Sequence, residues 1–302
     1  MEIMEEINTK ELVESFREKE RENADICTVI LKVNNAKFGI DKKTYDIKLF
    51  GKTMTEWVAN AVFDTEIRYA ECEFGDDFLP RVKNVFNPNA KYTVVLFSDT
   101  PLFEHKTFLQ IMEYFKMKDL SVLKLTRGYV FETKYLMQID SLLNPQMQYF
   151  EEEDFITCYS LKQVAIVREI LKNRILNYFM KNGVVIEDPA STFIDADVQI
   201  AKNTHIEPFC KILGQSVIED NVFIGSFSEI NDSVICSGVK VFGAKITNSL
   251  VESHAKVERF STISNNTKVC EEVVVPENCK LDGVVVKKED KLKSFYSYVS
   301  KE

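Results

Sequence analysis

The sequence predicts an α/β domain followed by an all-β parallel β-helix of hexapeptide repeats. In the first half of the chain, compact apolar runs alternate with helical patterns, as in α/β domains. In the second half, isoleucine recurs at every sixth position. A period of six fits neither the turn of about 3.6 residues in an α-helix nor the two-residue alternation of a strand. Short fixed repeats are typical of solenoids such as the β-helix. The isoleucines are Ile194, Ile200, Ile206, Ile212, Ile218, Ile224 and Ile230.

Each repeat is predicted to form one short strand and one turn, so that three repeats make a triangular coil. The isoleucines then point inward and stack between coils, each contributing roughly 1.5–3 kcal/mol when buried. A small or β-branched residue follows four positions after each one, from Val198 to Val234. Beyond Ile230 some steps shorten to five residues, and a regular run resumes from Val251 to Leu281. We predict a β-helix over residues 184–286. The tail, 287–302, caps its open end or packs on a neighbour.

The first half is predicted element by element. Residues 1–22 show the apolar spacing of an amphipathic helix. Further strands are predicted at 27–33, 92–97, 121–125 and 129–131, and helices at 52–63, with Thr53 as N-cap, and 106–117. Together they indicate an α/β domain over 23–160 with a mainly parallel sheet. A long helix over 161–183 links this domain to the β-helix.

Composition excludes several classes of function. The net charge of −9 argues against nucleic acid or an anionic membrane as partner. No apolar run reaches the length of a membrane span, and the acidic N-terminus lacks the apolar core of a signal peptide. Seven cysteines without a CxxC pair are typical of reduced thiols, so we expect a cytoplasmic protein. The three histidines show no metal-ligand spacing.

Three sets of residues are candidates for a functional site. Asp99 directly follows the apolar strand 92–97, and ligands bind at the carboxyl ends of parallel strands. It is a candidate metal ligand, or else the N-terminal cap of the next helix. Lys32, Lys37 and Lys43 form a basic cluster that would suit a phosphate or nucleotide, unless they are ordinary solvated lysines. His254 is either an acyltransferase base or a surface turn residue.

A motif at the end of the long helix carries a family resemblance. Its matching residues are Gly183, Val184, Asp188, Pro189, Ala190, Thr192, Ile194 and Asp195. They fit a G-V-x-x-x-D-P-A-x-T-x-I-D pattern, and this junction resembles that of the bacterial bifunctional UDP-N-acetylglucosamine pyrophosphorylase/glucosamine-1-phosphate N-acetyltransferases. The stretches at 48–58, 94–103 and 127–136 are similar to three motifs of the pyrophosphorylase domain. The resemblance implies a Rossmann-like nucleotidyltransferase fold, a left-handed β-helix, a homotrimer, and Mg²⁺ bound by Asp99. A left-handed coil is an exception to the right-handed crossover rule.

The sequence departs from the family where its chemistry resides. The place of the Gly-rich phosphate loop holds Lys32–Gly39, with one glycine and no arginine. The uracil-binding motif aligns with the acidic Glu73–Asp77, and the segment before Tyr129 that binds the sugar is shortened. The second metal ligand aligns with Tyr159 or Ser160, neither of which replaces an amide oxygen well. The printed sequence ends before the acetyltransferase motifs.

These departures favour a non-catalytic or strongly diverged relative that acts as a trimeric scaffold or binds a nucleotide sugar. A protein partner is also considered. One alternative is a Mg²⁺-dependent sugar-phosphate nucleotidyltransferase that uses Asp99. The other is a hexapeptide acyltransferase with sites in the clefts between subunits. No cofactor is predicted, except Mg²⁺ if nucleotidyltransferase activity is retained.

Overall fold

The computed structural model describes residues 25–300 except 36, 37, 40 and 42. The predicted helix at 1–22 and Lys37 therefore lie outside the described residues. The chain divides into two compact units, Met1–Val167 and Arg168–Glu302. The division falls within one continuous helix, α6 (Leu161–Lys181), where the sequence had suggested a separate linker over 161–183.

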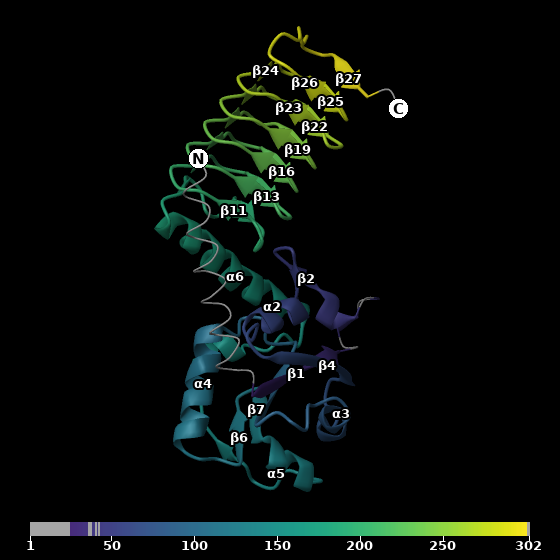
Figure 1. Ribbon diagram of the computed structural model, residues 1–302, viewed down its shortest axis with the longest axis vertical. Coiled ribbons are helices and arrows are strands. Elements are labelled where there is room, and N and C mark those ends of the chain that lie inside the picture. The colour runs from purple at the N-terminus through teal and green to yellow at the C-terminus, as the bar shows by residue number, and fades with distance from the viewer. Residues whose placement is uncertain (1–24, 36–37, 40, 42, 301–302) are drawn as a thin grey trace. The chain divides into compact units, whose positions relative to one another are not determined.

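The first unit is built on a six-stranded sheet in the order β4-β1-β5-β7-β6-β8 (Figure 1). Its strands are β1 (Ile26–Asn34), β4 (Glu66–Glu73), β5 (Tyr92–Phe97), β6 (Val122–Leu125), β7 (Gly128–Glu132) and β8 (Gln146–Met147). β1 runs parallel to β4 and β5, and β6 runs parallel to β8. β7 is antiparallel to both of its neighbours. The sheet is therefore mixed, and the prediction of a mainly parallel sheet is wrong around β7, because β6 and β7 form a tight hairpin.

Helices cover both faces of this sheet. They are α2 (Met54–Asn60), α3 (Leu79–Lys83), α4 (His105–Met117), α5 (Thr133–Gln138) and two 3₁₀ turns, η2 (Thr44–Asp46) and η3 (Glu152–Phe155). One hydrophobic cluster joins Ile30 of β1 to α2 and α4, and another joins Leu31 to α3 and α5. Burial on both faces explains why β1 and β5 are continuously apolar.

The start of α2 follows the predicted capping. The Thr53 hydroxyl accepts a hydrogen bond from the Glu56 backbone N–H, and the Glu56 carboxylate accepts one from the Thr53 N–H. This capping box satisfies two donors that the first turn would otherwise leave unpaired. The helix is shorter than predicted, because Lys52 and Thr53 form β3 (Lys52–Thr53), which pairs with β2 (Lys48–Leu49).

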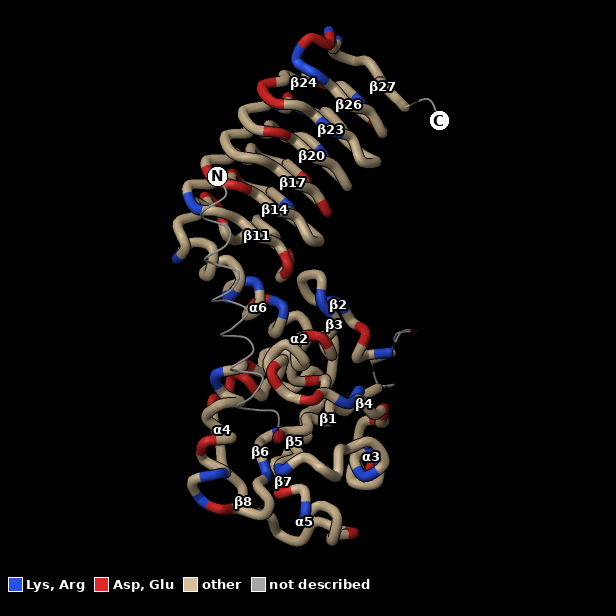
Figure 2. Tube along the Cα trace, in the orientation of Figure 1, with Lys and Arg blue, Asp and Glu red and all other residues tan. Residues whose placement is uncertain are grey.

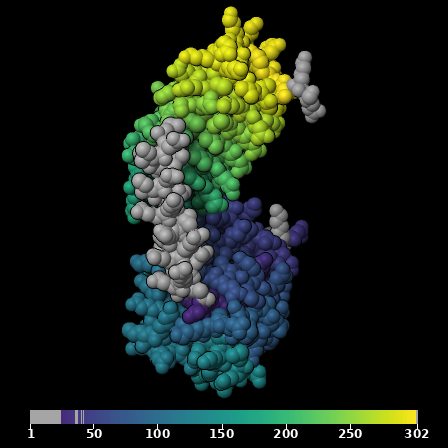
Figure 3. Space-filling model, in the orientation of Figure 1, coloured from purple at the N-terminus to yellow at the C-terminus, as the bar shows by residue number. Residues whose placement is uncertain are grey.

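The second unit is a left-handed parallel β-helix whose short strands stack into three sheets (Figure 1). In the space-filling view its atoms form one continuous body, coloured green to yellow (Figure 3). The first sheet contains β9 (Val185–Ile186), β12 (His205–Ile206), β15 (Phe223–Ile224), β18 (Lys240–Val241), β21 (Lys256–Val257) and β24 (Val274–Val275). The second contains β10 (Phe193–Ile194), β13 (Lys211–Leu213), β16 (Glu229–Asn231), β19 (Lys245–Thr247), β22 (Thr262–Ser264), β25 (Lys280–Asp282) and β27 (Ser297–Val299). The third contains β11 (Gln199–Ile200), β14 (Val217–Ile218), β17 (Val234–Ile235), β20 (Leu250–Val251), β23 (Lys268–Val269) and β26 (Val285–Val286).

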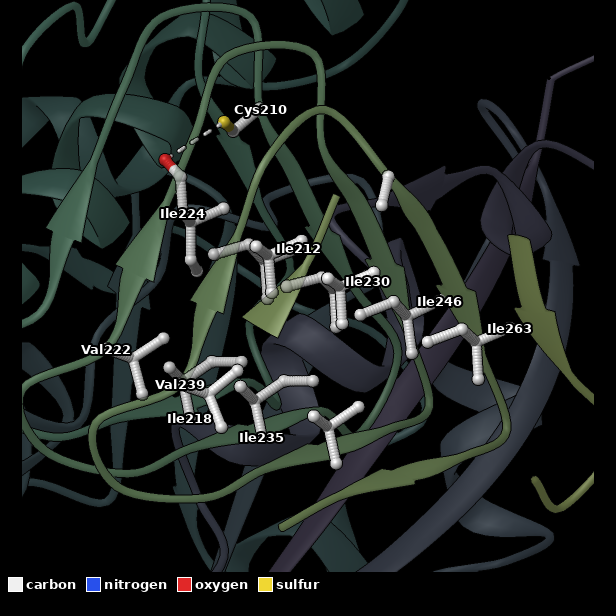
Figure 4. Packing of buried hydrophobic residues seen from close by; sticks show 14 of the residues in the cluster. Cys210, Ile212, Ile218, Val222, Ile224, Ile230, Ile235, Val239, Ile246 and Ile263 are labelled. Carbon is white, nitrogen blue, oxygen red and sulfur yellow. Dashed lines mark hydrogen bonds between the residues drawn. The ribbon is translucent and has the colours of Figure 1, made fainter. Parts of the chain in front are cut away.

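The predicted isoleucine ladder forms the core of this unit. Ile212, Ile230, Ile246 and Ile263 lie in register on successive coils and are completely buried (Figure 4). One expected small core position is wrong: Val234 faces outward and Ser233 is buried in its place. Ile230 and Ile235 are five residues apart, whereas the steps before Ile230 are six residues each. The small buried residue of this repeat therefore lies three residues after Ile230 and not four.

The tail continues the β-helix. β27 pairs in parallel with β25, and Tyr298 lies in register with Leu281. The strands therefore extend beyond the predicted limit at 286, and capping of the open end by the tail stays a prediction. Positions of Lys, Arg, Asp and Glu residues recur along the coils of the β-helix (Figure 2). Among the described residues, no helix combines the length and the apolar content that crossing a membrane requires.

Candidate functional site

The carboxyl ends of β1 and β5 lie side by side in the first unit, where a ligand is expected in such a sheet. The segment after β5 is fixed by hydrogen bonds. Ser98 accepts one from the backbone N–H of Val33 (2.9 Å) and donates its own N–H to the carbonyl of Leu31. The Asp99 carbonyl accepts one from the N–H of Cys158 at 2.7 Å. The Asp99 side chain is thereby held at this edge, and only 2% of the residue is exposed.

Asp99 pairs with Arg127 through both carboxylate oxygens. Nε of Arg127 donates to Oδ1 at 3.1 Å, and Nη2 donates to Oδ2 at 2.6 Å. The guanidinium also lies over the Phe97 ring, 3.9 Å from its centroid. Burial raises the pKa of the Asp99 carboxyl, and the bonds from Arg127 oppose that rise. A two-point pair of this kind is among the strongest and most directional contacts that a carboxylate can make.

The β6–β7 hairpin brings Arg127 to this place. Arg127 lies in the turn between Leu125 and Gly128, the pair that closes the hairpin. Gly128 has φ +143°, and a Cβ atom there would lie 2.7 Å from the carbonyl oxygen of Val95. Only glycine allows the hairpin to approach β5 so closely, because any side chain would meet fixed backbone.

The residues around Asp99 do not fit Mg²⁺. That ion requires oxygen ligands in an octahedral arrangement, whereas both Asp99 oxygens already accept bonds from a cation. Tyr159 is exposed, and the Ser160 hydroxyl accepts a bond from the N–H of Gln163 in the first turn of α6. No group of three or more potential ligand side chains is placed to hold a metal within the described part of the chain. The alternative role of Asp99 as a helix cap is wrong, because Glu104 precedes α4 as its N-cap.

The two described lysines of the predicted cluster lie in different surroundings. Lys32 is half-buried on β1, with its ammonium 5.0 Å from the ring centroid of Tyr69 and 5.8 Å from that of Tyr45. Those rings attract the charge through cation–π contacts. Lys43 is exposed just before η2. Aromatic packing therefore accounts for Lys32 without a phosphate.

A cavity of about 270 Å³ lies beside the hairpin. It is smaller than the roughly 300–1,000 Å³ of most small-molecule sites. Arg127, Lys124, Glu73 and Asp76 contribute to its lining, and the aromatic wall includes Tyr129. Both carboxylates already have partners: Glu73 accepts from the Asn34 amide, and Asp76 accepts from an arginine outside the cavity. This is the acidic stretch that aligned with the uracil-binding motif, and its carboxylate and phenyl side chains offer a nucleotide no hydrogen-bond donor.

Sequence reasoning missed Arg127. The sequence predicted only the apolar strand that follows Arg127, and an arginine in a turn is usually exposed to solvent. The only signal was that the stretch between the two strands had shortened, which had to bring the turn against β5. In the β-helix, His254 occupies a corner with φ +58° and an exposed side chain, as expected of a turn residue.

Comparison with known proteins finds matches to the β-helix and, in one relative, to a longer part of the chain. A family model described as the GMPPB C-terminal domain matches residues 194–300, most of the β-helix. The GlmU bifunctional protein of Limosilactobacillus reuteri is 27% identical over 251 residues, which cover 62% of this chain and 54% of that protein. Its counterpart from Fervidobacterium nodosum is 40% identical over 105 residues (35% of this chain, 23% of that protein), and that from Staphylococcus haemolyticus is 33% identical over 147 residues (47% and 33%).

These matches confirm the resemblance that the motifs indicated. The chain resembles GlmU-type bifunctional proteins in sequence and in its order of a Rossmann-like sheet followed by a left-handed β-helix. It spans about half the length of the first of these relatives, or less of the others.

Proposed function

We propose that this protein is a trimeric scaffold in which the nucleotidyltransferase-like unit no longer catalyses nucleotidyl transfer. The single observation that carries the proposal is the Asp99–Arg127 pair. In the related enzymes, the resemblance implies a magnesium ion at the position of Asp99. Here a guanidinium occupies both oxygens of that carboxylate, so the same edge of the sheet is held together by an internal ion pair instead.

A direct assay tests the loss of catalysis. The full chain, UTP, N-acetylglucosamine 1-phosphate and Mg²⁺ are combined, and released pyrophosphate is measured. We expect no release above that of the Asp99→Asn variant, since the wild-type carboxylate is not available to a metal. Pyrophosphate release by the wild type that disappears in Asp99→Asn would overturn the proposal and support the nucleotidyltransferase alternative.

The oligomeric state is a separate expectation. The β-helix exposes apolar side chains on its outer faces, among them Val185 and Val285, which are 52% and 59% exposed. Exposed apolar surface of this kind marks interaction sites in soluble proteins. Light scattering of the full chain is expected to give three times the 34.9 kDa chain mass. A mass of one chain would remove the scaffold as proposed, and with it any acyltransferase cleft between subunits.

The cysteines support a reducing location for this scaffold. All seven are free, and five are buried. Burial raises the pKa of Cys210 to about 11, so this thiol stays protonated and acts as an apolar core residue. Free thiols in this number fit the cytoplasmic setting that we propose.

A further inference from the structure

One corner of the β-helix differs from the other two. Between Asn203 and Gly283 each corner of the β-helix turns through a residue with positive φ, and at two of the three corners that residue is mostly glycine, asparagine or aspartate. At the third corner, which leads into the sheet of β13, this residue is phenylalanine on four coils, with φ between 59° and 64°, and it is Gly243 and Asn278 on two others. We call the four phenylalanines the phenylalanine corner: Phe209, Phe227, Phe260 and Phe295. Their residues are 55–76% exposed.

Phenylalanine is a poor choice for such a corner. A bulky side chain in the left-handed region is an outlier, because its Cβ crowds the backbone. An exposed ring also gains little from the hydrophobic effect. Asparagine or glycine would form the same turn at lower cost, as the other corners show. The rings are therefore explained by what they contact at the surface, and not by the turn itself.

The ladder of rings is interrupted at Gly243 and again at Asn278, in each case for one coil. Phe209 and Phe227, on successive coils, stack with centroids 5.1 Å apart and planes 4° apart. The next coil carries Gly243 at this position, and the coil after it carries Phe260, whose N–H donates to the Gly243 carbonyl. Coils repeat at about 4.8 Å, so Phe227 and Phe260 are about two steps apart. That separation leaves room for one flat ring between them.

The gap opens into a cavity with polar groups at its edge. The cavity is about 380 Å³, within the range of small-molecule sites, and is lined by Glu207, Gly225, Ser226, Phe227, Phe242, Gly243, Arg259 and Phe260. Oε2 of Glu207 accepts two bonds from Ser226, at 2.8 Å each, whereas Oε1 accepts none among the described residues. The bonds from Ser226 lower the pKa of Glu207, so its carboxylate is charged at neutral pH. Arg259 is exposed and carries a positive charge nearby.

We propose that this slot binds the base of a purine nucleotide, stacked between Phe227 and Phe260 above Gly243. The free oxygen of Glu207 accepts a hydrogen bond from an N–H of the base, and Arg259 pairs with the phosphate. Any base can stack on aromatic rings, and a purine, with its larger face, has the larger contact area with the rings of Phe227 and Phe260. The adjacent carboxylate and guanidinium match a nucleotide, which carries both N–H donors and an anion, better than an aromatic side chain of a second copy, which carries no anion.

Titration calorimetry of the full chain with ATP, GTP, UTP and inorganic triphosphate tests the slot. ATP or GTP is expected to bind more tightly than UTP, and triphosphate alone more weakly than any nucleotide. Gly243→Phe places a ring between Phe227 and Phe260 and fills the slot, so it is expected to abolish nucleotide binding. The backbone accommodates this change, because Gly243 has φ +54° and its neighbours on the ladder carry phenylalanine at +64° and +61°. Its Cβ would lie 3.1 Å from the Ser226 carbonyl, which must move by a few tenths of an ångström.

Milder variants keep the test decisive if Gly243→Phe fails to fold. Phe227→Leu and Phe260→Leu each remove one wall and are expected to weaken ATP binding on the order of tenfold. Phe295→Leu is the matched control, since it changes an equally exposed ring of the same corner outside the slot and is expected to leave binding unchanged.

The proposal is overturned if the wild type binds no purine nucleotide at millimolar concentration. It is also overturned if Phe295→Leu weakens binding as much as Phe260→Leu, or if Gly243→Phe lowers the mass of the assembly, which would assign the slot to a neighbouring chain. None of these outcomes bears on the pyrophosphate assay.

Discussion

Replacement of Arg127 by methionine is expected to lower the free energy of unfolding of the first unit by about 3–5 kcal/mol at neutral pH. Arg127 supplies both hydrogen bonds from a side chain to the Asp99 carboxylate, which is 97% buried as a side chain. Methionine retains apolar contact with Phe97 but leaves a buried charge without its partner. Loss of a partner from a buried pair is far more damaging than loss of the whole pair.

The single tryptophan of the chain reports on this unit alone. Trp57 lies on α2, and its indole N–H donates to the Leu49 carbonyl at 2.8 Å. Its fluorescence during urea unfolding therefore follows the first unit without a signal from the β-helix. Arg81→Met is the matched control, because Arg81 forms an exposed pair with Asp76 and is expected to contribute no more than about 1 kcal/mol. The double variant Asp99→Asn with Arg127→Met is expected to recover much of the lost stability.

The pH dependence of Arg127→Met separates charge from packing. Burial already raises the pKa of Asp99, and loss of the arginine bonds raises it further. A carboxyl whose folded pKa exceeds its unfolded value of about 3.9 loses stability as the pH rises above that value. The deficit is therefore expected to be largest near pH 8 and to shrink toward pH 5. A deficit that does not change with pH would assign the effect to lost packing on Phe97 instead.

Ile230→Ala is expected to destabilise the β-helix by about 2–5 kcal/mol. Ile230 is fully buried between Ile212 and Ile246, so truncation leaves a cavity that the coils above and below cannot close without breaking their register. Circular dichroism follows the strands of both units, whereas Trp57 fluorescence follows the first unit alone. The variant is therefore expected to shift part of the circular dichroism transition while the Trp57 transition stays in place. A coincident shift of both transitions would contradict the independence of the two units.

Two adjacent valines provide the control for the ladder. In β24, Val275 is fully buried and Val274 is 57% exposed. Both lose the same two methyl groups on change to alanine, so the difference in stability between the variants measures burial alone. Val275→Ala is expected to destabilise the β-helix and Val274→Ala to have little effect. Equal effects would mean that the ladder is not the source of stability.

The sequence was most informative where physical demands repeat along the chain. Every third strand must place an apolar residue over that of the coil below, so the regular spacing of isoleucines in the sequence predicted their stacking in the structure. The N-cap at Thr53 and the strand before Asp99 were equally local signals. β4 gave no such signal, because it lies at the edge of the sheet and carries mostly polar residues.

The sites depended on contacts that no local pattern encodes. Asp99 follows β5, and Arg127 lies in the turn of the β6–β7 hairpin, which packs closely on β5 because Gly128 has no side chain. Neither residue shows this contact in its own stretch of sequence. The phenylalanine corner was present in the repeat, three residues after Ile206, Ile224 and Val257. It was overlooked because attention to the inward positions leaves the corner residues aside.

The shortened turns of the β-helix separate its length from its residue count. Ile212 and Ile230 pair across 18 residues, whereas Ile230 and Ile246 pair across only 16. Both coils advance the stack by the same strand spacing of about 4.8 Å. The length of the β-helix therefore depends on its number of coils, and insertions or deletions at the corners leave that length unchanged. Duplication or deletion of one whole coil would change the length by a single strand spacing and keep each of the three sheets on its own side.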